Sequence, residues 1–173
     1  ERLLLIGIAG GLSDDLAVGS LIQAVSVRNA GSEEERHAPA GLLEGPEPGL
    51  VISTDRILST HESKRELFDD LGRPSRCAVD LESWSVVCAA EDAGVPWTVV
   101  RAISDASHED LPLDFAALSN EDVQVMRSRI ILSLLRHPVA IKGVLEMRSR
   151  VQSCARDLAL AAERWLLTGE SVC

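Results

Sequence analysis

Apolar and polar residues follow one another in blocks along the chain, and the blocks predict alternating strands and helices. Apolar or β-rich runs predict strands at 3–8, 20–27, 50–53, 76–80 and 97–103. Helical spacing predicts helices at 59–71 and 82–93, which end at Gly72 and Gly94. Such alternation is typical of a sheet that helices cover on both faces, so we predict an α/β fold.

Two segments depart from this alternation. Residues 29–49 contain four Gly and three Pro, which predicts a long loop of the kind that forms lids or binding segments. From residue 120 the apolar spacing turns helical, breaks at His137-Pro138 and resumes from Val139 to Trp165. We therefore expect a single domain over 1–173, with amphipathic helices over 120–173. Because residue 3 already enters a strand, we also expect the chain to begin inside the domain, without its N-terminal strands.

The charge is unevenly distributed. The net charge is −10, but residues 1–120 hold 9 basic and 21 acidic side chains, while residues 121–173 hold 8 and 6. An acidic chain with only 3% aromatic residues is poorly suited to phosphate contacts or base stacking, so we expect no nucleic-acid partner. The basic balance of the tail instead suggests that its helices touch an anionic membrane surface if the substrate is a lipid.

The cysteines point to a reducing compartment. They stand far apart in the sequence, with no Cys-x-x-Cys pair and no histidine at zinc spacing, at Cys77, Cys88, Cys154 and Cys173. We therefore expect reduced thiols in a cytoplasmic protein, with no metal and no cofactor. No apolar run approaches the length that crosses a bilayer.

A glycine-containing segment follows the first predicted strand. Ile8, Ala9 and Gly10 precede Gly11, where backbone N–H groups can approach a ligand because glycine has no Cβ. The spacing matches neither the dinucleotide fingerprint nor the P-loop, which argues against a dinucleotide-dependent oxidoreductase. A plain tight turn at Gly10-Gly11 is the interpretation we prefer for such a pair of glycines.

Three carboxylates, Asp80, Glu82 and Asp105, follow predicted strands. Ligands bind at the carboxyl ends of strands in open α/β sheets, so these side chains are candidates for a site. Each also has a structural interpretation. We prefer an N-cap for Asp80, while Glu82 would complement a helix dipole and Asp105 would cap a turn. From spacing alone these alternatives remain open.

Three motifs together resemble one known family. They are Gly-Ile-Ala-Gly-Gly-Leu at 7–12, followed by Val-Gly-Ser-Leu-Ile at 18–22; Asp-Leu-Glu-Ser at 80–83; and Val-Val-Arg-Ala-Ile-Ser-Asp at 99–105. Their order and spacing over residues 3 to about 118 resemble the nucleoside phosphorylase and nucleosidase superfamily. The nearest resemblance is to methylthioadenosine/S-adenosylhomocysteine nucleosidases and to the hopanoid-associated phosphorylase group. It implies a phosphorylase/hydrolase-like three-layer sandwich with a mixed central sheet.

The resemblance also implies roles for individual residues. Glu82 would bind the ribose hydroxyls and stabilise the oxocarbenium-like cation. Asp105 would be the general acid at purine N7, oriented by Ser104. Leu81 would pack on the sugar in place of the usual Met. The remaining implied substrate-binding residues lie in the glycine segment and after the third strand: Ile8, Ala9, Gly10, Asp55, Arg56 and Ile57.

The implied reaction is cleavage of the N-glycosidic bond of an adenine nucleoside, by hydrolysis. Family phosphorylases hold phosphate with arginines and a hydroxyl in the glycine segment, whereas this chain has Ile8 there and no arginine in the strand before it. The residue that activates the water would precede residue 1. Phosphorolysis and a non-catalytic nucleoside-binding domain are the alternatives. An open sheet edge and its apolar surface would favour a homodimer or a retained N-terminal fragment.

Overall fold

The computed structural model describes residues 1–39, 41–111 and 139–168. In chain order the elements are β1 (Leu3–Gly11), β2 (Leu21–Asn29), β3 (Glu35–His37), β4 (Glu47–Ser53), α1 (His61–Asp70), β5 (Cys77–Asp80), α2 (Ser83–Asp92), β6 (Trp97–Asp105) and α4 (Val139–Thr168). The predicted α/β class is confirmed.

The described strands form one mixed sheet in the order β3-β2-β4-β5-β1-β6. β1 runs parallel to β6, and β4 lies parallel to both β2 and β5. β1 is antiparallel to β5, and β2 is antiparallel to β3. β2 also pairs with β6 through Leu21 and Ala102, so the sheet closes on itself. The mixed sheet was predicted; its closure was not, because the pattern of one strand does not identify its neighbours.

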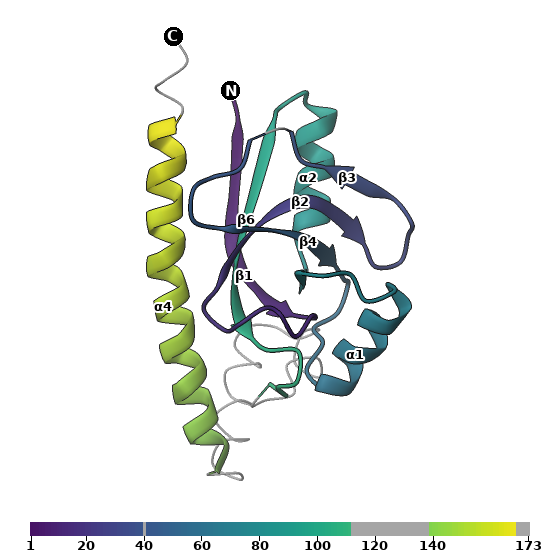
Figure 1. Cartoon of the computed structure of the whole chain (residues 1–173), viewed down its shortest axis with the longest axis vertical. Coiled ribbons are helices and arrows are strands. Elements are labelled where there is room, and N and C mark those ends of the chain that lie inside the picture. The colour runs from purple at the N-terminus through teal and green to yellow at the C-terminus, as the bar shows by residue number, and fades with distance from the viewer. Residues whose placement is uncertain (40, 112–138, 169–173) are drawn as a thin grey trace, which may run out of the picture.

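Helices cover the sheet from different sides (Figure 1). α4 lies along β1 and β6, where Cys154, Leu158 and Ala161 pack on buried Val100 and Ala102. α2 packs on the main core, and α1 covers a smaller apolar cluster beneath β4 and β5. The described helices include none that is both long and apolar enough to cross a membrane.

The expected loop over 29–49 is partly wrong. It contains the short strand β3, and β4 begins at Glu47 rather than at Leu50. β3 pairs with β2 from Ser26 with His37 to Arg28 with Glu35, using backbone hydrogen bonds that charged side chains do not prevent. Glu35 and His37 are exposed, while Arg36 is half-buried and pairs with Glu91 at 3.0 Å. A strand made of charged residues carries no apolar pattern, which is why the sequence resembled a loop.

The expected tight turn at Gly10-Gly11 is also wrong, because both residues belong to β1. The register of β1 against β6 shifts between Ala9 and Gly10, and Gly10 pairs with Asp105. A Cβ on Gly10 would lie 3.0 Å from Asp105 Oδ2. Glycine at position 10 therefore allows β1 and β6 to approach each other closely, and it does not form a turn. β1 is less buried than expected, since Ile8 is 40% exposed.

The predicted helix ends are confirmed. Thr60 caps α1 by accepting the Ser63 N–H, and Gly72 after the helix has a φ of +75°. Gly94 after α2 has a φ of +67°, a conformation that favours glycine. α4 corresponds to the second tail helix. The helix expected from residue 120 lies outside the described residues.

Candidate active site

A cavity of about 310 Å³ lies where β1, β5 and β6 end and where the chain leaves β4. This volume falls within the range of small-molecule sites, and the position is where sheets of this class bind ligands. Nine of the ten site residues implied by the sequence line it: Ile8, Ala9, Gly10, Arg56, Ile57, Leu81, Glu82, Ser104 and Asp105. Asp55 lines a neighbouring cavity on the α1 side instead.

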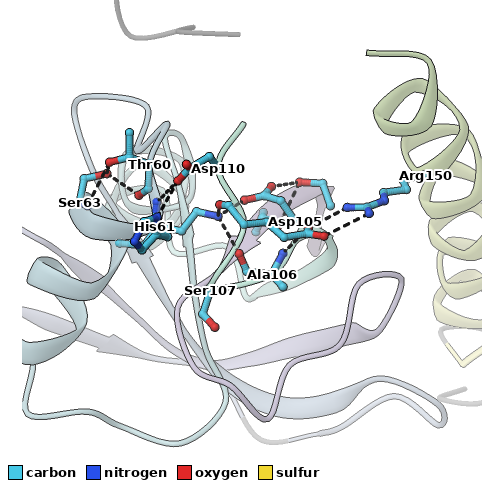
Figure 2. Close-up of polar contacts among 12 residues, drawn as sticks. Thr60, His61, Ser63, Asp105, Ala106, Ser107, Asp110 and Arg150 are labelled. Atoms are coloured by element: carbon cyan, nitrogen blue, oxygen red, sulfur yellow. Dashed lines mark hydrogen bonds and ion pairs between the residues drawn. The ribbon is translucent and has the colours of Figure 1, made fainter. Parts of the chain in front are cut away.

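Asp105 is held on two sides by hydrogen bonds. Lys64 Nζ of α1 lies 2.5 Å from Asp105 Oδ2, and Ser104 Oγ donates to Oδ1 at 2.6 Å. Both side chains of the ion pair are largely buried. Figure 2 shows Asp105 between the N-terminal end of α1, with Thr60 and His61, and Arg150 of α4. Lys64 of α1 and the adjacent Ser104 of β6 therefore fix this carboxylate at the cavity wall.

Glu82 lies in a different environment. It is the N-cap residue of α2, its side chain makes no capping hydrogen bond, and it is exposed. Among the described residues it has no ion-pair or hydrogen-bond partner for its carboxylate. A carboxylate at a helix N-terminus has a favourable dipole interaction and remains free to accept hydrogen bonds from a ligand. It is thus available to two neighbouring hydroxyls.

A buried polar network fixes the backbone around Glu82. Arg101 Nη2 lies 2.7 Å from Asp80 Oδ2, and Ser53 Oγ donates to Asp80 Oδ1 at 2.6 Å. Asp80 Oδ1 also accepts the N–H of Ser83, the first residue of α2. The preferred interpretation of Asp80 as the N-cap residue is therefore wrong by position, since Glu82 occupies it. Asp80 nevertheless satisfies one helix N–H while its main partner is Arg101.

The segment after β4 forms another wall of the cavity. Thr54, Arg56 and Ile57 line it, and Thr54 Oγ1 donates to the Arg56 carbonyl at 2.7 Å. Leu58 adds a buried apolar surface. Arg56 has no ion-pair partner among the described residues, so its guanidinium remains available to a ligand.

α4 reaches the cavity through one side chain and one ion pair. Met147 lines the cavity beside Leu111. Arg150 binds Glu109 through two contacts, of 2.7 and 3.1 Å. Hydrogen bonding by the Arg150 guanidinium holds the pKa of Glu109 below its ordinary value. Because Glu109 also accepts the Ala106 N–H, this pair ties α4 to the residues that follow Asp105.

Two functional candidates were missed by the sequence reasoning, Lys64 and Arg101. A signal for Lys64 did exist: it stands three, four and seven residues before Leu67, Phe68 and Leu71, on the apolar face of the predicted helix. A lysine on such a face needs a buried acceptor. Arg101 is a charged residue within the mostly apolar strand predicted over 97–103. A charge in such a strand likewise predicts a buried partner. The partner itself depends on tertiary contacts.

Comparisons with known proteins identify the family of this chain. The model of the family described as Phosphorylase superfamily matches residues 46–136. A 5'-methylthioadenosine/S-adenosylhomocysteine nucleosidase of Mycobacterium bovis is 33% identical over 89 residues, which cover 50% of this chain and 32% of that protein. The chain thus spans about a third of that relative's length.

Solved structures resemble the fold. The 5'-methylthioadenosine/S-adenosyl homocysteine nucleosidase (MTAN) of Campylobacter jejuni matches with a TM-score of 0.54 and 19% identity, over 66% of this chain and 60% of that one. An MTAN of Chlamydia trachomatis matches with a TM-score of 0.61 and 13% identity, over 95% and 63%. At these identities the likeness concerns the fold.

Proposed function

Because the chain belongs to the phosphorylase superfamily, we propose that it cleaves the N-glycosidic bond of an adenine nucleoside by hydrolysis. The observation that carries the proposal is a single cavity that holds Glu82 and Asp105 on different walls. The relatives named nucleosidases support the same reaction.

Each carboxylate has its own part in the proposed step. As the bond between C1′ and N9 breaks, its electron pair enters the purine, and Asp105 delivers a proton to N7 so that the base leaves neutral. Glu82 accepts hydrogen bonds from the ribose hydroxyls and stabilises the positive charge that develops on the sugar. Water then forms the new bond to C1′ and releases a proton to solvent.

The cavity supports hydrolysis over phosphorolysis. Within the described residues, the cations that line it are Arg56 and Lys64, and Lys64 is already paired with Asp105. Ile8 offers no hydroxyl to a phosphate. A phosphate dianion needs several charge-assisted hydrogen bonds, whereas a water molecule needs fewer.

The 5′ substituent is proposed to be apolar. Ile8, Leu81, Leu111 and Met147 line the cavity, and Ile8 and Leu81 are about 40% exposed. Such a surface suits a methylthio group, a hopane lipid or the thioether segment of a homocysteinyl chain better than a bare hydroxyl. Methylthioadenosine, S-adenosylhomocysteine and adenosylhopane are therefore the substrates to test first.

The deciding experiment measures adenine release from these three nucleosides by the full-length protein, with and without phosphate. We expect release without phosphate and a free sugar as product. Strict dependence on phosphate, with a sugar 1-phosphate as product, would establish a phosphorylase. Binding of adenine nucleosides without any release would establish the non-catalytic alternative.

Variants at the two carboxylates test the site itself. Glu82→Gln and Asp105→Asn should each raise the activation free energy by roughly 3 kcal/mol or more, since each acts mainly in the transition state. Glu33→Gln and Asp92→Asn make the same chemical changes at exposed positions and should leave the rate unchanged. Unchanged rates in the two site variants would refute the assignment.

We further propose a cytoplasmic homodimer. Cys77, Cys88 and Cys154 are free thiols, which suits a reducing compartment. The argument from an open sheet edge loses force because β2 pairs with β6, and the exposed Ile6 and Val25 lie on strands that are not neighbours. A solution mass equal to one chain of the full-length protein would rule out the dimer.

Contact of α4 with an anionic membrane remains a proposal for a lipid substrate. Arg148 and Arg156 are exposed on α4, whereas Arg150 is engaged by Glu109. Neutralising Arg148 and Arg156 together should therefore weaken partitioning onto anionic vesicles. Unchanged partitioning would contradict the idea.

A further inference from the structure

The most unusual polar group in the described part of the chain is the side chain of Lys64. It is fully buried, although lysine is among the residues least often found inside proteins. It nevertheless lines the cavity together with Asp105, so its head group lies at the wall of the proposed reaction site. The roles assigned above to Glu82 and Asp105 make no use of this group.

All three protons of the Lys64 ammonium have acceptors. One points to Asp105 Oδ2 at 2.5 Å, and the others to the carbonyl oxygens of Ala106 and Glu109 at 2.8 and 2.9 Å. Backbone carbonyls accept hydrogen bonds but are too weakly basic to take a proton. Among these three partners, only Asp105 can receive one.

Asp105 needs such a source. In its ion pair with Lys64, Asp105 is a carboxylate, and it must gain a proton before it can give one. A general acid must nevertheless hold one when the base leaves. Among the described residues lining the cavity, the other cation is Arg56, and a guanidinium does not give up its proton in proteins.

The geometry points to Lys64 as the proton donor to Asp105, an inference that rests on the proposed function. A Lys64 Nζ–H bond breaks, its electron pair stays on nitrogen, and the proton binds Asp105 Oδ2. Asp105 then passes its proton to purine N7 as the electron pair of the glycosidic bond enters the base. Lys64 is left as a neutral amine and recovers a proton from water that enters the cavity after the base leaves.

The space beside Asp105 Oδ2 fits this sequence of events. A Cβ on Gly10 would lie 3.0 Å from Oδ2, so glycine is the residue that leaves this oxygen uncovered on the β1 side. Oδ2 faces Lys64, and the Asp105 side chain lines the cavity together with Gly10. The same carboxyl group therefore contacts the proposed donor and borders the space where the base would lie.

The alternative is that Lys64 supplies only a fixed positive charge that positions Asp105. Rate measurements with three variants of the full-length protein separate the two roles. Lys64→Ala removes the amine, Lys64→Arg keeps the charge without a proton to give, and Arg65→Met is an exposed control on the same helix. Adenine release is measured with methylthioadenosine, first alone and then with ammonia, methylamine and ethylamine added.

We expect Lys64→Ala to lower kcat by roughly 100-fold or more with little change in KM, since general acid catalysis contributes about that factor. Lys64→Arg should be similarly slow. Small amines that enter the cavity of Lys64→Ala should restore part of kcat, and the restored rate should vary with the acidity of the amine. Arg65→Met should match the wild type.

Several results would overturn the inference. Wild-type kcat in Lys64→Ala, or recovery of the rate in Lys64→Arg, would reduce Lys64 to a structural or positioning residue. The inference would also fail if no amine restored the kcat lost in Lys64→Ala, provided that this variant unfolds and binds adenine like the wild type. A wild-type protein that releases no purine would instead refute the proposed function, and the inference with it.

Discussion

The two walls of the cavity hold the same chemical group in opposite ways. At one wall Asp105 is buried and bonded by Lys64 and Ser104. At the other, Glu82 is exposed, and its backbone rather than its carboxylate is fixed, by the network around Asp80. A carboxylate that must handle a proton is enclosed with a proton source, whereas one that must bind hydroxyls is left open to them.

The two walls are alike in how they contribute to the stability of the fold. Both walls depend on a buried ion pair, Lys64 with Asp105 and Arg101 with Asp80. Removing one partner of such a pair leaves the other charge buried and uncompensated. The first pair contains a proposed catalytic group, while the second lies behind the site.

The largest effect is expected at the pair behind Glu82. Arg101→Met should lower the free energy of unfolding by about 3–5 kcal/mol, because Asp80 would remain buried without its counter-charge. Urea denaturation measures this directly. The double variant Arg101→Met/Asp80→Leu removes both charges and should recover much of the loss. A single variant within about 1 kcal/mol of the wild type would show that this pair does not hold the Glu82 wall.

A smaller effect is expected where the two strands approach each other. Gly10→Ala places a Cβ 3.0 Å from Asp105 Oδ2 and 3.4 Å from Val79 Cγ1. Crowding of this kind costs about 1–3 kcal/mol, and displacement of Asp105 should also slow adenine release.

Gly31→Ala is the matched control for this change, since the nearest atom to its new Cβ is 3.9 Å away. It should leave both stability and rate nearly unchanged. If Gly10→Ala behaved like Gly31→Ala, the close contact between β1 and Asp105 would have no functional meaning.

The smallest effect concerns the link between α4 and the Asp105 wall. The pKa of Glu109 is held below its ordinary value chiefly by its hydrogen bond with Arg150. The stabilisation is therefore fully present above the ordinary pKa of a glutamate and is lost as the pH falls through the lowered value. Both side chains are about one-third exposed, so solvent screening limits the contribution to about 1 kcal/mol or less.

Glu109→Gln tests this link through the pH dependence of unfolding. The variant should be slightly less stable than the wild type at pH 7, and the difference should disappear in acid. Glu33→Gln, an exposed change without an ion-pair partner among the described residues, should show no such dependence. A difference that persisted or grew as the pH fell would contradict the assigned role of the pair.

The sequence predicted those parts of the molecule that depend on local signals. α1 and α2 end where Gly72 and Gly94 follow them, because a positive φ is a local requirement of glycine. The edge strand β3 was missed because it depends on backbone pairing with β2 and on the tertiary ion pair of Arg36 with Glu91, which its charged sequence does not predict. The pairing of β2 with β6 was missed because it depends on the whole sheet.

The same distinction applies to the cavity. The motifs placed Glu82 and Asp105 at strand ends and implied the Ser104 contact, but they did not reveal that Lys64 is the other partner of Asp105. Lys64 comes from a helix 41 residues before Asp105, and only the fold brings the two together. The apolar face of α1 carried a signal that Lys64 is buried, although it gave no indication of the acceptor.

The central claim is that the two carboxylates do different work on one nucleoside, and leaving-group dependence tests it most directly. Rates should be measured for the full-length wild type, Asp105→Asn and Glu82→Gln, with methylthioadenosine and with 4-nitrophenyl riboside, whose leaving group needs no proton. We predict that Asp105→Asn loses roughly 100-fold or more on the nucleoside and little on the nitrophenyl compound, whereas Glu82→Gln loses activity on both. Equal losses by Asp105→Asn on both substrates would contradict a proton-donating role and, with it, the proposed division of labour.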